Sequence, residues 1–205
     1  MSRTDRELEV KYHVNDLSSC QERLQDLDGV LVKPRILERN FRFDTPDGEL
    51  TKQEQVLRLR QDDAAKVTYK GPSFDEQGAR LRQEYEFTVS DFQAAHKLFE
   101  ALGFQIFMLY EKFRTTYRLD NVEIVLDEMP YGDFLEIEGS NAEDIAAASH
   151  SLGLDWERRV LGSYTLIFTQ LREQLGWGFR DLSFDNFLGL DPNLAVVGIL
   201  PADKG

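Results

Sequence analysis

The chain has 205 residues, of which 30% are charged and 41% hydrophobic, a balance typical of one globular domain with a sizeable core. Its net charge of −13 argues against nucleic acid or an anionic membrane as a partner, because both require an electropositive surface. The single cysteine, Cys20, excludes an internal disulfide, and no apolar run is long enough to span a bilayer. We therefore expect a cytoplasmic protein with no membrane partner.

Taken in chain order, the hydrophobic pattern predicts many strands and few helices. Alternation of polar and apolar residues predicts strands at about residues 7–14, 36–44, 55–61, 65–70, 80–89, 104–119, 122–128 and 134–138. Apolar residues at helical spacing predict helices at about residues 16–27, 91–102, 142–152 and 163–175. Gly71 and Pro72 are expected to stop the fourth strand. Short turns between so many strands indicate a barrel or a strongly curved antiparallel sheet.

The predicted strands carry charge on one face and hydrocarbon on the other. In the first strand Glu7, Glu9 and Lys11 share a face, because residues at i, i+2 and i+4 of a strand point the same way. The same alternation places on one face Arg58 with Arg60, Lys66 with Lys70, Arg80 and Arg82 with Glu84 and Glu86, Lys112 with Arg114 and Arg118, and Glu136 with Glu138.

This charged face has the chemistry of a metal–polyphosphate site. Arginine binds phosphate oxygens in bidentate fashion, and carboxylate pairs are hard-oxygen ligands for Mg²⁺ or Mn²⁺. The alternative is an ordinary sheet face exposed to solvent, which is common in antiparallel proteins. Because the chain is so acidic overall, a polyanion site also requires that lysine and arginine gather in the interior while acidic residues spread outside.

The charged motifs together resemble the CYTH superfamily, the triphosphate tunnel metalloenzymes. The resemblance covers about residues 7–164, and its motifs come in the order Glu7-x-Glu9-x-Lys11, Leu57-Arg58-Leu59-Arg60, Thr68-Tyr69-Lys70-Gly71-Pro72, Glu84-x-Glu86, Lys112-x-Arg114 and Gly132-x-Phe134-x-Glu136-x-Glu138. It implies an α+β fold, a closed eight-stranded antiparallel β-barrel that forms a tunnel, with helices packed on the outside. It also implies a divalent metal, Mg²⁺ or Mn²⁺, and a small-molecule substrate that carries a triphosphate.

The resemblance implies a role for each motif residue. The metal ligands would be Glu7, Glu9, Glu136 and Glu138, with Asp127 as a further candidate. The phosphate oxygens would be held by Arg58, Arg60, Lys70, Arg82, Lys112 and Arg114, while Lys11 would stabilise charge near the reacting phosphates. Glu84 and Glu86 would serve a second metal or position the attacking water, or else pair with an arginine across the tunnel.

Two reactions are compatible with this site. Hydrolysis of an inorganic or organic triphosphate is ranked first, and the alternative is a class IV adenylyl cyclase that converts ATP to cyclic AMP and pyrophosphate. A non-catalytic sensor of polyphosphate or nucleotide and an interaction protein with an exposed charged face are the remaining options. We expect residues 1–175 to form the tunnel domain, and the aromatic extension 176–205 to pack on it or on a partner subunit in a homodimer.

Overall fold

Eight strands and five helices make up most of the structure, a computed structural model that describes residues 6–203. The strands are β1 (Arg6–Val14), β2 (Val30–Asp44), β3 (Val56–Gln61), β4 (Ala65–Glu76), β5 (Ala79–Val89), β6 (Gln105–Leu119), β7 (Val122–Met129) and β8 (Gly132–Gly139). The helices are α1 (Leu17–Asp26), α2 (Glu49–Lys52), α3 (Phe92–Ala101), α4 (Ala142–Ser151) and α5 (Tyr164–Leu175), with short 3₁₀ turns at Trp156–Arg158, Phe184–Phe187 and Leu194–Val197.

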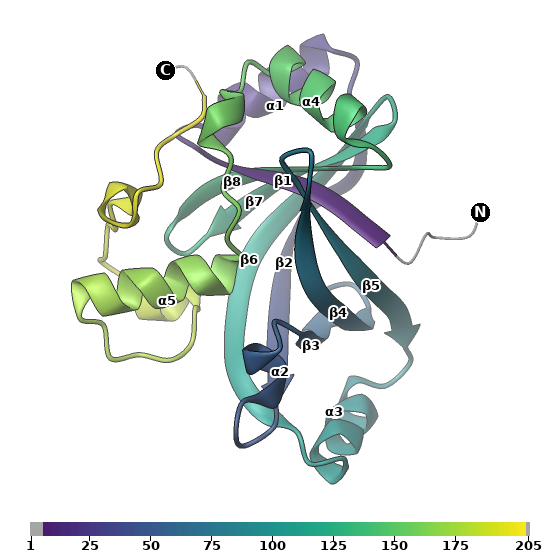
Figure 1. Cartoon of the computed structure of the whole chain (residues 1–205), viewed down its shortest axis with the longest axis vertical. Helices are drawn as coiled ribbons and strands as arrows, with labels where there is room; N and C mark the ends of the chain where they lie inside the picture. Colours follow the sequence, from purple (N-terminus) through teal and green to yellow (C-terminus); the bar gives the residue numbers. More distant parts are fainter. Residues whose placement is uncertain (1–5, 204–205) are drawn as a thin grey trace.

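The strands close into an antiparallel barrel in the order β1-β5-β4-β3-β2-β6-β7-β8 (Figure 1). Most neighbours are also consecutive in the chain, so short turns suffice to connect them. Closure depends on β1, which pairs with β5 on one side and β8 on the other, so that Glu9 lies opposite both Arg80 and Glu138. This arrangement confirms the predicted barrel with helices on its outside.

The alternation within each strand separates a charged interior from an apolar exterior. In β1, Glu7, Glu9 and Lys11 line a cavity inside the barrel. The residues that alternate with them, Leu8, Val10 and Tyr12, pack outward in a buried cluster that is covered by α1 and α4. The hydrophobic core of the molecule therefore lies between the barrel and its helices, and the space inside the barrel remains polar.

The two helices over this cluster begin where capping residues place them. Asp16 caps α1 by accepting a hydrogen bond from the Ser18 N–H at 2.8 Å. Asn141 caps α4 in the same way, accepting from the Asp144 N–H at 2.8 Å. A second cluster, at the end of the barrel near α3, packs Phe99 against Phe43 with ring centroids 5.0 Å apart.

The C-terminal segment packs on α5 and β6. Leu182 donates a backbone hydrogen bond to the Leu109 carbonyl at 2.9 Å and accepts one from the Glu111 N–H at 2.8 Å. Its side chain is fully buried in a cluster with residues of α5, including Phe168. The segment thus extends the sheet by one short bridge and covers α5.

Removing the Leu182 side chain should therefore destabilise the whole protein. We expect Leu182→Ala to lower the free energy of unfolding by about 2–5 kcal/mol, since a buried leucine loses its transfer free energy and leaves a cavity. Leu188 in the same segment is 80% exposed, so Leu188→Ala is a matched control with an effect within about 0.5 kcal/mol. Urea denaturation of both variants measures the difference, and equal effects would mean that the segment does not fold with the barrel.

Two strand boundaries differ from the sequence prediction. β2 begins at Val30 rather than residue 36, and its pairing with β6 shifts register on both sides of Lys33. β4 runs on to Glu76, so the prediction that Gly71 and Pro72 stop it was wrong. The β4–β5 register shifts between Lys70 and Ser73, and because the ladder is interrupted there, the missing N–H of Pro72 is tolerated.

The short helix α2 was not predicted at all. Its first turn is held by Asp44, whose carboxylate accepts hydrogen bonds from the Leu50 N–H at 2.9 Å and the Thr51 N–H at 3.0 Å. These partners lie six and seven residues away, which is outside the local capping pattern that a sequence reading detects. No helix in residues 6–203 combines the length and the hydrophobicity that a membrane span requires.

Candidate active-site tunnel

The interior of the barrel is a cavity of about 1290 Å³ lined by charged side chains. Among the described residues that line it are twelve lysines and arginines and ten aspartates and glutamates, whereas the whole chain has 24 and 37. Half of the basic residues but only about a quarter of the acidic ones thus face one cavity. This agrees with the expectation that positive charge is gathered inside an acidic protein, and it gives a polyanion a place to bind.

The paired carboxylates of β1 and β8 come together on one side of this tunnel. Glu9 lies directly opposite Glu138, and Lys11 lies opposite Glu136. The Lys11 Nζ is 2.5 Å from a Glu136 carboxylate oxygen, whereas among the described residues the nearest ion-pair partner of Glu9 is Arg80, at 3.9 Å. Glu136 is therefore neutralised by a close partner, but Glu9 is not.

Burial and neighbouring negative charge raise the pKa of two of these groups. Removal from bulk water, together with repulsion from neighbouring carboxylates, raises the pKa of Glu138 to about 8. Burial raises the pKa of Glu9 as well, assisted by Glu7 and Glu136 and opposed by Lys11. The glutamates at this point of the wall thus repel one another, and a bound cation would relieve that repulsion.

The carboxylates on the β1–β8 side of the tunnel have the chemistry of ligands for a divalent metal. Within residues 6–203 no group of three or more acidic, histidine or cysteine side chains is already arranged to hold a metal ion. Glu9 and Glu138 nevertheless supply hard carboxylate oxygens from directly paired positions, and Glu7 precedes Glu9 on the same face of β1. These three residues are the ones that would hold Mg²⁺ or Mn²⁺.

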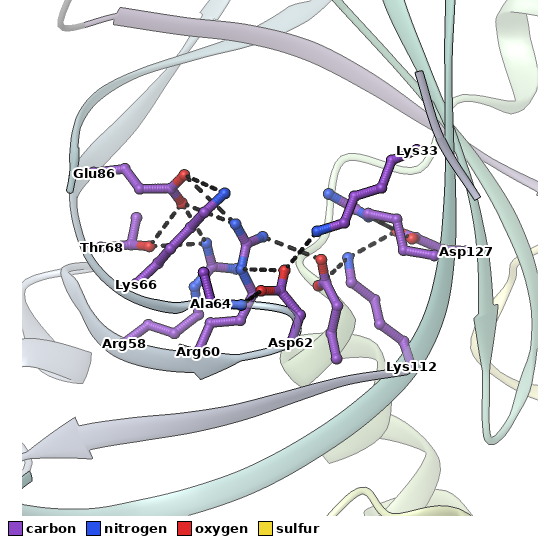
Figure 2. A network of polar contacts seen from close by, with 12 residues as sticks. Lys33, Arg58, Arg60, Asp62, Ala64, Lys66, Thr68, Glu86, Lys112 and Asp127 are labelled. Carbon is purple, nitrogen blue, oxygen red and sulfur yellow. Dashed lines mark hydrogen bonds and ion pairs between the residues drawn. The ribbon is translucent and has the colours of Figure 1, made fainter. Parts of the chain in front are cut away.

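A second charged group is centred on Glu86, as Figure 2 shows. Its carboxylate accepts a hydrogen bond from the Thr68 hydroxyl at 3.1 Å and lies 3.5 Å from both Arg58 and Arg60. The Lys66 Nζ is 3.6 Å away. Burial opposes ionisation, but the two guanidinium groups and Lys66 lower the pKa of Glu86 to about 2. Glu86 thus remains ionised and holds three cations at the tunnel wall.

Lys70 joins two of the predicted functional glutamates. Its Nζ is 2.6 Å from Glu7 and 3.1 Å from Glu84. Burial opposes the charge of this lysine, but the two carboxylates raise the pKa of Lys70 well above its usual value, so it stays protonated. The structure therefore brings Lys70 next to the side of the tunnel that carries the candidate metal ligands, where an ammonium group could also contact a phosphate.

Asp127 lies behind the tunnel wall and anchors two cations. It is fully buried, and it accepts hydrogen bonds from the Lys112 Nζ at 2.9 Å and from the Arg114 Nε at 2.7 Å. The hydroxyl of Tyr164 donates to the same carboxylate at 2.8 Å. With its oxygens occupied in this way, Asp127 is suited to orienting the cations rather than to the metal-ligand role considered from the sequence.

Arg82 is also engaged by the protein itself. Its guanidinium donates to the Gly71 carbonyl at 3.1 Å and 2.6 Å and to the Glu54 carbonyl at 3.3 Å. These bonds hold the irregular part of β4 and the segment after α2 against β5. Arg82 lines the tunnel, and its Nη1 group makes none of these three bonds, so that group could still donate to a phosphate.

Sequence reasoning missed three residues of this site. Glu38 lines the tunnel 3.2 Å from Arg60 and 3.8 Å from Lys112, and Tyr110 accepts a hydrogen bond from Arg58 at 3.1 Å. The parity of β2 could have revealed Glu38, because it shares a face with Arg42. Nothing in the sequence points to Tyr164, the third, because its contact with the tunnel depends on where α5 docks.

Cations surround the newly found Glu38. Burial opposes its ionisation, but Lys112 and the nearby guanidinium groups lower the pKa of Glu38 to about 2. One of its carboxylate oxygens is buried without a hydrogen-bond partner among the described residues. Glu38 thus separates and orients neighbouring cations, as Glu86 and Asp127 do, so three ionised carboxylates arrange the basic side of the tunnel.

Comparison with known proteins places this site in a family. A family model, the CYTH domain, matches residues 5–150. A protein of Methanocaldococcus jannaschii that is provisionally named an adenylate cyclase is 30% identical over 136 residues, which cover 65% of this chain and 77% of that protein.

Solved structures share the barrel. One from Vibrio parahaemolyticus, also provisionally named an adenylate cyclase, has a TM-score of 0.73 at 20% identity, covering 82% of this chain and 99% of that one. One from Hippeastrum, described as having a dominant triphosphatase activity, has a TM-score of 0.63 at 20% identity, covering 80% and 95%. Since the family model spans well over half of the sequence and includes all eight strands, the chain belongs to the CYTH domain family.

Proposed function

We propose that the protein is a divalent-metal-dependent enzyme that hydrolyses a triphosphate compound inside the tunnel. The observation that carries the proposal is the joint lining of one cavity by a repelling carboxylate pair, Glu9 and Glu138, and by twelve basic side chains. Binding a polyanion alone requires only the cations. Carboxylates whose pKa is raised by burial and by neighbouring carboxylates in the same cavity are explained by a metal bound beside the phosphates.

The chain's own residues would bind and orient the substrate. Arg58, Arg60 and Lys112 present cationic groups whose positions are fixed by Glu86, Glu38 and Asp127. Preorganised cations stabilise the charge that develops on phosphate oxygens without reorganising during the reaction. A bound Mg²⁺ or Mn²⁺ would supply further charge neutralisation at the phosphates.

The hydrolytic step needs no covalent enzyme intermediate. A water oxygen forms a bond to the terminal phosphorus, and the bridging P–O bond breaks to release orthophosphate and the shortened polyphosphate. Glu84, which is 3.1 Å from Lys70, is the carboxylate that we assign to orienting this water, and Lys11 stabilises the phosphoryl oxygens.

Adenylyl cyclase activity is the second candidate, and the resemblance to the Methanocaldococcus jannaschii protein favours it. There the 3′-hydroxyl of ATP would attack the α phosphorus and pyrophosphate would leave. The shared barrel does not separate the two reactions, because the Hippeastrum protein has the same fold and a dominant triphosphatase activity.

Product analysis tests the proposal. The pure protein is incubated with Mg²⁺ or Mn²⁺ and either tripolyphosphate, thiamine triphosphate or ATP, and the products are resolved by chromatography. We expect metal-dependent release of orthophosphate. Cyclic AMP with pyrophosphate would establish the cyclase instead, and tight binding without turnover of any of the three compounds would show a sensor.

Metal affinity should depend on pH through Glu138. Because the pKa of Glu138 is raised to about 8, the carboxylate is mostly protonated at neutral pH and must lose its proton to bind a cation. We therefore expect Mn²⁺ affinity, measured by titration calorimetry, to rise about tenfold between about pH 7 and about pH 9. In Glu138→Gln the affinity should be lower and its rise over this range should disappear. A pH-independent affinity in the unmodified protein would contradict the assignment.

A further inference from the structure

The first residue of α5 takes part in the tunnel although it lies outside the family match, which covers residues 5–150. Tyr164 follows Ser163, whose hydroxyl caps the helix by accepting from the Leu166 N–H at 3.2 Å. One end of the helix lies next to β6 (Figure 1). Residues from its first turn line the cavity. Tyr164 itself is only 7% exposed. The docking of α5 thus delivers an aromatic ring to the charged interior.

Both ends of this side chain contact charged groups of the tunnel. The hydroxyl donates to Asp127 at 2.8 Å, onto the same oxygen that accepts from Lys112 at 2.9 Å. The ring centroid lies 4.3 Å from the Lys11 Nζ and 5.2 Å from the Lys112 Nζ. Tyr164 therefore contacts both lysines. Its ring faces Lys11 and Lys112, and its hydroxyl is linked to Lys112 a second time through Asp127.

These contacts restrict groups that would otherwise be mobile. A lysine side chain is a point charge on a flexible stem, and an ammonium group over an aromatic face is attracted by the ring quadrupole. The hydrogen bond to Asp127 fixes the carboxylate that holds Lys112 and Arg114. Burial and the nearby carboxylates raise the pKa of Tyr164 well above its usual value, so its hydroxyl stays a donor.

We propose that Tyr164 is a positioning residue that holds Lys11 and Lys112 in place for the substrate phosphates. The phosphate-binding role of the two lysines rests on the proposed function. The positioning itself rests on the contacts of Tyr164, so the helix after the matched region is a working part of the site.

Two substitutions at Tyr164 separate the roles of its hydroxyl and its ring. Tyr164→Phe removes the bond to Asp127 and keeps the ring, whereas Tyr164→Leu removes both. The matched control is Tyr131→Phe, because Tyr131 is also buried and donates its hydroxyl to the Tyr164 carbonyl at 3.0 Å rather than to a charged group. Both Tyr→Phe variants lose one buried hydrogen bond in the same cluster.

The first measurement is the affinity for inorganic tripolyphosphate by titration calorimetry, with metal removed by EDTA. We expect Tyr164→Phe to bind about tenfold more weakly, as suits the loss of a hydrogen bond to a charged acceptor. Tyr164→Leu should bind more weakly still. Tyr131→Phe should bind within about twofold of the unmodified protein, even though it loses a similar amount of thermal stability.

The second measurement does not depend on a substrate. NMR spectra of protein labelled with ¹³C at lysine Cε should show Lys11 shifted upfield by the ring, retained in Tyr164→Phe and lost in Tyr164→Leu. The inference would be overturned if Tyr164→Leu left the lysine spectra unchanged. It would also be overturned if Tyr164→Phe and Tyr131→Phe lost the same affinity for tripolyphosphate. Failure of the unmodified protein to bind tripolyphosphate would instead overturn the proposed function, and the phosphate role of the lysines with it.

Discussion

Replacing Glu9 with glutamine should abolish metal-dependent turnover, lowering the rate by roughly a hundredfold or more. An amide is isosteric with the carboxylate but lacks the negative charge that a hard cation requires. Glu9 faces Glu138 directly, and within residues 6–203 its only ion pair is the long one to Arg80 at 3.9 Å, so its carboxylate is little used by the protein itself. The rate of phosphate release at saturating Mg²⁺ or Mn²⁺ measures the loss.

The same substitution should leave the fold intact. Because burial and neighbouring carboxylates raise the pKa of Glu9, its ionised form is disfavoured in the folded protein, and a neutral side chain removes that cost. We therefore expect Glu9→Gln to unfold at the same temperature as the unmodified protein or a higher one. Glu22→Gln, at an exposed position of α1, is the control and should change neither quantity. Full activity in Glu9→Gln would refute the metal assignment.

The largest loss of stability is expected from Asp127→Asn. Asp127 is fully buried and compensates Lys112 and Arg114, so removing its charge without changing its volume leaves buried cations unpaired. Breaking a buried ion pair from one side costs about 3–5 kcal/mol. The free energy of unfolding from urea denaturation measures this loss. A loss below about 1 kcal/mol would show that water or Glu136, which is 2.6 Å from Arg114, compensates the buried cations instead.

A double variant separates lost charge balance from lost packing. If unpaired charge causes the instability, Lys112→Met in the Asp127→Asn background should recover part of the loss, since the methionine fills a similar volume without a charge. Lys112→Met alone should be destabilising. Additive losses in the double variant would contradict the charge explanation.

The alternation of charged and apolar residues within the strands could be predicted from the sequence, because it depends on local geometry alone. Successive strand residues point to opposite faces, so Glu7, Glu9 and Lys11 had to share a face wherever the strand lay. The order of the motifs then indicated the barrel through the family resemblance. Pro72 shows the limit of local reasoning, because a proline ends a strand only if the ladder is regular at that point, and here the register shifts.

The roles of individual charges were less predictable, because they depend on partners distant in the sequence. Lys70 and Glu7 are 63 residues apart, and Tyr164 and Asp127 are 37 apart, yet each pair makes a short hydrogen bond. Whether a lysine is free for a phosphate or a carboxylate is free for a metal follows from such contacts. From the sequence, Asp127 was a candidate metal ligand. In the structure its carboxylate instead holds Lys112 and Arg114.

The amino-acid sequence by itself determined that charge and hydrocarbon lie on opposite faces of each strand, and it fixed the set of acidic and basic residues available for chemistry, because side-chain direction along a strand is a local property. Only the tertiary structure decided which of those charges neutralise one another and which remain available. Ring closure through β1 places Glu9 beside Glu138, and the docking of α5 brings Tyr164 onto the lysines. Both are long-range contacts, and the strength of an electrostatic interaction depends on distance and burial that only the folded chain specifies.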